Sequence, residues 1–148
     1  MRGKGNPQMA MMRSPDPRRF EKAAFFRDLG YTPHAGQRLV HESQAPRRVL
    51  ACGVRWGKTR SAAMEGLAAA MEPKPRGSHG WVVAPTYDLA EKVFREIAAI
   101  ATGKLRHRIP RGGYKPGSMR LRIVNLAGRV SEIQAKSGES PVSLLGEG

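Results

Sequence analysis

Residues 53–59, Gly-Val-Arg-Trp-Gly-Lys-Thr, combine residue types that bind phosphate groups. They follow residues 48–52, a short apolar run that predicts a buried strand, and precede an Ala-rich helix predicted over 61–71. A strand, a glycine-bearing turn and a Gly-Lys-Thr that opens a helix form the context of a phosphate-binding loop. The unpaired N–H groups and the positive dipole end of such a helix attract phosphates. We therefore predict a nucleotide-binding site here.

The side chains of this loop have expected roles. Gly53 and Gly57 belong to the part that holds the nucleotide, Lys58 can reach the β- and γ-phosphates, and the Thr59 hydroxyl can ligate Mg²⁺. The alternatives are an ordinary surface lysine at position 58 and a Thr59 that only caps the helix. The match to the general pattern G-x-x-x-x-G-K-[ST] is incomplete, because Cys52 stands where its first glycine would be.

Composition narrows the class of partner. The chain has 26 Lys and Arg against 12 Asp and Glu, a formal charge of +14, which favours a polyanionic partner over a neutral one. Nucleic acid is the first expectation, an acidic membrane surface the second, and a merely solvated basic surface the alternative. The single cysteine excludes an internal disulfide and a cysteine-only zinc site. No apolar run approaches the ~20 residues of a spanning helix, and no signal peptide is predicted.

The order of elements predicts the fold class. Residues 1–19 read as a basic, mobile arm, and residues 20–148 as one domain. Strands alternating with helices predict an α/β fold with a mostly parallel sheet flanked by helices. After the loop and its helix come a Pro/Gly linker over 73–80, a strand over 81–84, a helix over 89–101, a basic loop over 102–118, and a strand pair over 121–125 and 129–135.

Two short helices are predicted before the loop. The first covers 20–29 and is closed by Gly30. In the second, Thr32 caps a helix that begins at Pro33 and runs to about Ser43. The four histidines of the chain show no metal-ligand spacing, so they predict no zinc site.

Four segments, in order, resemble the large terminase subunits of tailed bacteriophages, the motors that package DNA into proheads. Residues 32–37 (Thr-Pro-His-Ala-Gly-Gln) resemble the adenine-side glutamine motif of that family, and residues 51–59 resemble its arginine-rich phosphate loop, G-R-R-W-G-K-T. Residues 83–87 are similar to its V-A-P-T-Y segment, and residues 137–148 resemble the stretch before its acidic strand. The resemblance runs from about residue 31 to residue 148.

The resemblance implies a P-loop NTPase-like fold that uses ATP and Mg²⁺. It implies double-stranded DNA, a portal protein and a small terminase subunit as partners, an oligomer in the full-length motor, and a place in the host cytoplasm. By the same resemblance Gln37 faces adenine, whose N6/N7 edge an amide can pair. An ordinary exposed helix residue is the alternative at this position.

The sequence departs from the family pattern at two points. Val54 stands where the family often has a first loop arginine, so Arg55 is the expected catalytic arginine, with pairing to a nearby carboxylate as the alternative. The family's Asp-Glu at the end of an apolar strand has no counterpart up to Gly148. We therefore expect these 148 residues alone to hydrolyse no ATP.

Two other functions fit the same residues. A helicase-type translocase shares the order of glutamine motif and phosphate loop. A non-catalytic, basic nucleic-acid-binding fragment would need only the charge, to which Arg106, His107, Arg108 and Arg111 contribute a cluster that could follow a DNA backbone or simply be solvated.

Overall fold

A computed structural model describes residues 20–139 of the chain. The basic arm predicted over 1–19, and most of the segment that resembles the family over 137–148, lie outside the described residues. Within the described range no helix is both long enough and apolar enough to cross a membrane.

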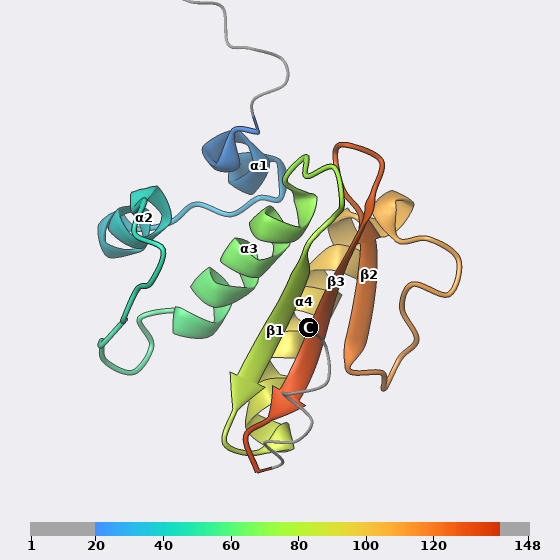
Figure 1. Cartoon of the computed structure of the whole chain (residues 1–148). Helices are drawn as coiled ribbons and strands as arrows, with labels where there is room; N and C mark the ends of the chain where they lie inside the picture. Colours follow the sequence, from blue (N-terminus) through green and yellow to red (C-terminus); the bar gives the residue numbers. More distant parts are fainter. Residues whose placement is uncertain (1–19, 140–148) are drawn as a thin grey trace, which may run out of the picture.

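The centre of the fold is a three-stranded sheet in the order β1-β3-β2. β1 (His79–Ala84) pairs in parallel with β3 (Val130–Ser137), and β2 (Arg120–Val124) pairs with β3 in the antiparallel sense. Helices α3 (Lys58–Met71) and α4 (Tyr87–Lys104) cover one face of this sheet (Figure 1). The predicted α/β class is confirmed, and the described sheet is mixed rather than mostly parallel.

The core forms where the two long helices meet the sheet. Side chains alternate in direction along a strand, so Leu121, Ile123 and Ile133 share the face toward the helices and are buried there. Met64 and Leu67 of α3 and Phe94 and Ile97 of α4 fill the space between the helices and the sheet. Burying a Leu- or Phe-sized side chain contributes about 1.5–3 kcal/mol each, so this core is the main source of stability.

The strand predicted over 48–52 is wrong. These residues form no strand, and Val49 is 98% exposed. A strand needs a neighbour to bond its backbone N–H and C=O groups, and this segment pairs with none of the described strands. Instead, Arg48 Nη1 donates to Val40 O at 2.6 Å, and Cys52 O accepts from Lys58 Nζ. Apolar content alone therefore overstated how deeply this segment is buried.

The predicted hairpin over 121–135 is confirmed, and one buried amide fixes its turn. Asn125 Oδ1 accepts from the N–H groups of Ala127 and Arg129, both at 2.9 Å, and Gly128 supplies the positive φ of 75°. Asn125 Nδ2 donates to Lys74 O at 2.9 Å. This bond attaches the turn to the linker that follows α3.

The predicted short helices α1 (Lys22–Asp28) and α2 (Ala35–Glu42) form and lie beside α3 (Figure 1). The predicted Thr32 cap is wrong. His34 is the N-cap of α2, because its ring accepts from Gln37 N while the Gln37 side chain accepts from His34 N. The chain therefore enters α2 two residues later than expected.

A carboxylate on α3 holds both short helices in place. Glu65 Oε1 accepts from Lys22 Nζ of α1 at 2.9 Å and contacts His41 Nδ1 of α2 at 2.6 Å, while Oε2 accepts from Arg48 at 3.0 Å. Burial by itself would raise the pKa of Glu65, but the bonds from these three partners outweigh it and hold that pKa below its ordinary value of 4.5.

Replacing Glu65 by Gln should lower the free energy of unfolding by about 1–3 kcal/mol at pH 7, because Lys22 and Arg48 lose their charged partner. A lowered folded-state pKa stabilises the fold above the unfolded pKa, and this contribution is lost as pH falls through the folded value. The difference between wild type and Glu65→Gln in urea unfolding should therefore shrink at pH 3. Glu91→Gln, which breaks a surface pair with Arg95, is the control. An equal difference at both pH values would contradict this assignment.

Candidate functional site

The predicted phosphate-binding loop is a tight turn directly before α3. Arg55 and Gly57 have left-handed backbone, with φ of 66° and 89°, and Gly57 is the N-cap of the helix. The φ of Gly57 favours glycine, and a Cβ there would lie 2.7 Å from Gln37 Nε2, so the Gln37 amide would have to move. A Cβ at Gly53 would meet nothing within 4 Å, so only a ligand could make glycine necessary there.

Lys58 begins α3 and folds back over the loop. Its Nζ donates to Gly53 O at 2.7 Å and to Cys52 O at 3.0 Å. The side chain is exposed and has no carboxylate partner among residues 20–139. The structure thus places an uncompensated ammonium inside the loop, next to the free N–H groups at the start of a 14-residue helix. An anion reaching this point meets both.

The side chain of Gln37, a residue of α2, lies between that helix and the loop. It is 5% exposed, and its Nε2 donates to Trp56 O at 3.3 Å and to Gly57 O at 3.5 Å. With its Oε1 bonded to His34 N, both ends of the amide are occupied within the protein. To pair with adenine, Gln37 would have to exchange these partners.

Sequence reasoning missed His34. Its Nε2 lies 3.1 Å from Trp56 O, and the two rings contact edge to face with centroids 4.8 Å apart. The signal was present, because a glutamine three residues after a polar residue is the spacing of a capping box. His34 and Gln37 together attach the first turn of α2 to the loop.

The alternatives weighed for Thr59 and Arg55 find no support in the described structure. The Thr59 hydroxyl does not cap α3, whose N-cap is Gly57, and it is exposed. Arg55 pairs with no carboxylate within residues 20–139. Both side chains are therefore free to meet a ligand at the mouth of the loop.

The residues present fit a nucleoside triphosphate with its magnesium ion. Lys58 and the first N–H groups of α3 suit phosphate oxygens, and the Thr59 hydroxyl is a ligand type that Mg²⁺ accepts. The described part of the chain has no group of three His, Cys, Asp or Glu side chains able to hold a metal ion.

A second site of positive charge begins in the C-terminal half of α4. Residues 97–131 contain no Asp or Glu, and we call them the basic segment; they carry Lys104, Arg106, Arg108, Arg111, Lys115, Arg120, Arg122 and Arg129. Arg120 and Arg122 are paired with Glu132, and Arg108 donates to Asn125 O. The other five have no ion pair within the described structure.

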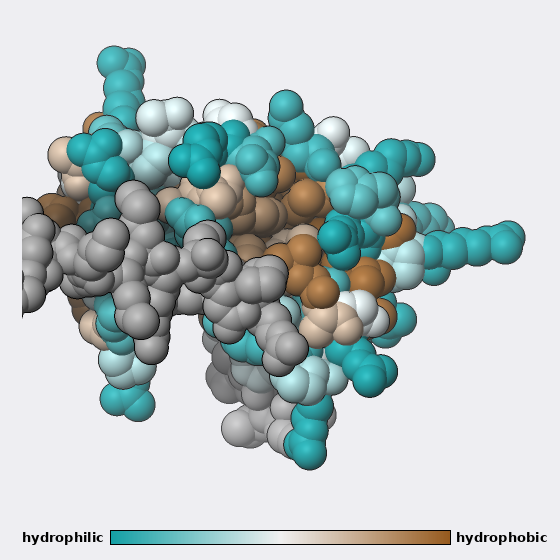
Figure 2. Space-filling view, turned by 90° about the horizontal axis from the view of Figure 1, so that it is seen from above, coloured by the Kyte–Doolittle hydropathy of each residue, from teal (hydrophilic) through white to brown (hydrophobic). Residues whose placement is uncertain are grey.

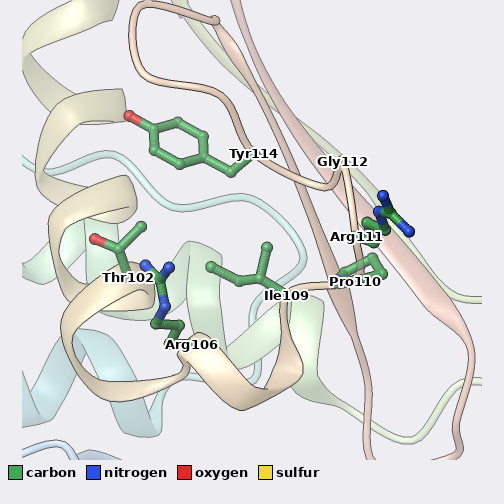
Figure 3. A pocket seen from close by; sticks show the side chains of 7 residues that line it. All are labelled: Thr102, Arg106, Ile109, Pro110, Arg111, Gly112 and Tyr114. Atoms are coloured by element: carbon green, nitrogen blue, oxygen red, sulfur yellow. The ribbon is translucent and has the colours of Figure 1, made fainter.

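A cavity of about 260 Å³ lies in the basic segment, beside the short helix η1 (Arg106–Arg108). Figure 3 shows Arg106 and Thr102 on one side of it and Tyr114 on the other, with the Arg111 side chain directed away.

Figure 2 views the end of the molecule that carries α1 and the β2–β3 turn, and long hydrophilic side chains project there around a more hydrophobic centre.

Comparison with known proteins identifies the family. No protein-family model matches the chain. It is 35% identical over 134 residues to the large terminase subunits of Thermus phage G20c and Thermus virus P23-45, a match that covers 82% of this chain and 27% of theirs. Its structure resembles the large terminase ATPase domain of Thermus phage P74-26, with a TM-score of 0.69 and 31% identity over 84% of this chain and 53% of that domain. The chain therefore belongs to the large terminase family and corresponds to part of its ATPase domain.

Proposed function

We propose that the chain is the nucleotide-binding part of a viral DNA-packaging motor. It spans about a quarter of the length of the curated relatives, so the activity of the whole motor is part of the proposal. In that motor, ATP hydrolysis drives double-stranded DNA into the prohead in the host cytoplasm. A portal protein and a small terminase subunit are its proposed partners, and an oligomer is its proposed working form.

The observation that carries this proposal is the loop that precedes α3. Two residues of the loop have left-handed backbone, and the Lys58 ammonium at the helix N-terminus has no carboxylate partner within residues 20–139. Together they form an anion site whose geometry suits a phosphate chain. Bound Mg²⁺ would supply charge neutralisation of the phosphates. The protein would hold the nucleotide: Lys58 and the α3 N–H groups would bind the phosphates, Thr59 would ligate the cation, and Arg55 would contact the γ-phosphate. Gln37 would pair with the base after exchanging its present partners.

The relatives favour the packaging motor over the two other functions. The matched proteins are large terminases, whereas a helicase-type translocase would share only the order of the motifs. A non-catalytic basic fragment would not need the closely fitted contact between Gly57 and Gln37, which has no purpose in binding by charge alone.

Lys58→Ala should weaken ATP binding by roughly ten- to a hundredfold, because a charge-assisted hydrogen bond contributes about 1.5–3 kcal/mol. Isothermal titration calorimetry with Mg²⁺ and ATP measures the change. Lys74→Ala, at the opposite end of α3, removes the same charge and should bind like wild type. Equal affinity of Lys58→Ala and wild type would remove Lys58 from the site.

Arg55→Asn should weaken ATP binding about tenfold and leave ADP binding nearly unchanged, since only ATP has the γ-phosphate that Arg55 is proposed to contact. Asn tolerates the left-handed backbone of this position, so the loop keeps its shape. Competition with a fluorescent nucleotide gives both affinities. An equal loss for ATP and ADP would place Arg55 elsewhere than at the γ-phosphate.

We further propose that the basic segment contacts the DNA backbone. Five of its cations have no carboxylate partner within residues 20–139, and Arg106 lines a cavity that also offers the hydroxyls of Thr102 and Tyr114. Guanidinium and hydroxyl groups are common partners of phosphodiester oxygens. This arrangement predicts contact with the backbone rather than with base edges.

DNA affinity should fall steeply with salt and should not depend on sequence, because bound cations release the counterions of the phosphates. Replacing Arg106 and Arg111 by Ala together should reduce the slope of log K against log salt by roughly 1–2. The double variant Arg27→Ala, Lys92→Ala removes two exposed charges from α1 and α4 and serves as the control. Fluorescence anisotropy with unrelated duplexes gives the slopes, and identical slopes for the two double variants would contradict a role for this segment.

A further inference from the structure

A buried polar network connects α2 with α3 close to the phosphate-binding loop. His41 is 4% exposed, and its Nε2 lies 3.0 Å from the Tyr31 hydroxyl and 3.3 Å from the Ser61 hydroxyl. Its Nδ1 lies 2.6 Å from Glu65 Oε1. With Nδ1–H donating to the carboxylate, Nε2 is the acceptor nitrogen, and its single lone pair faces the two hydroxyls. No buried side-chain polar atom within residues 20–139 lacks a partner.

Ser61, His41 and Glu65 have the connectivity of a nucleophile, a base and an orienting carboxylate. Nucleophilic catalysis would require a substrate at the Ser61 hydroxyl. Ser61 is 2% exposed, in the first turn of a helix packed in the core, so a substrate does not reach it. The network therefore acts through the positions that it fixes.

The network is not needed simply to fill space. The rings of Phe26 and Tyr31 pack edge to face on His41, with centroids 4.7 Å and 5.6 Å away, and an apolar side chain of similar size could occupy the same place. Apolar replacements of buried polar groups are often as stable as the original. What directional hydrogen bonds add is one defined arrangement of the elements they join.

The elements joined here are the two that hold the loop. His41 lies one turn after Gln37 on α2, and both side chains are buried on the same face of that short helix. Gln37 bonds the carbonyls of Trp56 and Gly57, while Ser61 lies one turn after Gly57 on α3. A shift of α2 along α3 would thus be transmitted directly to the loop backbone.

We propose that His41 is a positioning residue for the nucleotide site: by locking α2 to Ser61 and Glu65 of α3, it sets where Gln37 and His34 hold the phosphate-binding loop. The nucleotide part of this inference rests on the proposed function, whereas the effect on the loop does not.

The loop can be observed directly in the full chain through Trp56. The chain has two tryptophans, so a Trp81→Phe background leaves Trp56 as the only one. In this background, His41→Leu should shift the Trp56 emission and increase its quenching by acrylamide. His41→Gln, whose amide can donate to Glu65 and accept from Tyr31, should resemble the parent. Leu39→Ala, an exposed position on the same helix, should leave Trp56 unchanged.

ATP affinity gives the second readout. His41→Leu should weaken ATP binding roughly three- to tenfold, as expected for a residue that acts on a site through a neighbouring element, and His41→Gln should restore most of it. Ile123→Val removes a buried methyl from β2, away from the network, and shows what a loss of stability alone does. Thermal unfolding of every variant provides the comparison.

The outcomes separate the two proposals. If His41→Leu changes neither Trp56 nor ATP binding, or if Ile123→Val reproduces its effects at an equal loss of stability, His41 has only a structural role and the inference is overturned. If Trp56 responds as expected while no variant, wild type included, binds ATP, the positioning of the loop is supported and the proposed nucleotide function fails.

Discussion

Gly57 joins the phosphate-binding loop to α3 through left-handed backbone, at a point where a Cβ would collide with the Gln37 amide. This close contact brings the start of α2 onto the loop and lets Gln37 bond the carbonyls of Trp56 and Gly57. At the same end of α3, the Lys58 ammonium donates to Gly53 O and Cys52 O. A larger residue at position 57 would be strained by the left-handed backbone and would displace the Gln37 amide from the loop.

Carboxylates are scarce in this chain, and their placement decides where positive charge remains available. Glu65 gathers Lys22, His41 and Arg48 and so joins α1, α2 and the segment before the loop to α3. Glu132 forms ion pairs with Arg120 and Arg122 on the sheet. Burial by itself would raise the pKa of Glu132, but hydrogen bonds from Arg122 and Gln134 outweigh it and lower that pKa. Among the residues that the structure describes, the charges left without a carboxylate include those at the loop and at the end of α4. Glu65 and Glu132 thus join elements of the fold through the basic residues that they pair with.

The two anion sites differ in how they are built, and this difference matches the ligands proposed for them. At the loop, backbone N–H groups and one lysine are held by fitted contacts with α2, which suits one phosphate chain in one orientation. In the basic segment, Arg106 and Arg111 line a cavity together with Thr102 and Tyr114, and no carboxylate of residues 20–139 lines it, which suits a repeating polyanion whose sequence is not read.

The sequence alone determined the glycine-bearing turn before α3, the α4 helix, the β2–β3 hairpin and the family, because these depend on local patterns: glycines before a helix, apolar spacing and turn residues. It could not determine whether residues 48–52 pair with a neighbour, since an apolar run predicts a strand only where another strand supplies hydrogen bonds. It also gave no sign of the roles of His41 and Glu65, or of the contact between His34 and Trp56. Their partners lie 22 or 24 residues away, or on other helices, so only the packing of α2 against α3 brought them together. Local motifs can be recognised from neighbouring residues, whereas the position of a site depends on contacts between segments that are distant in the sequence.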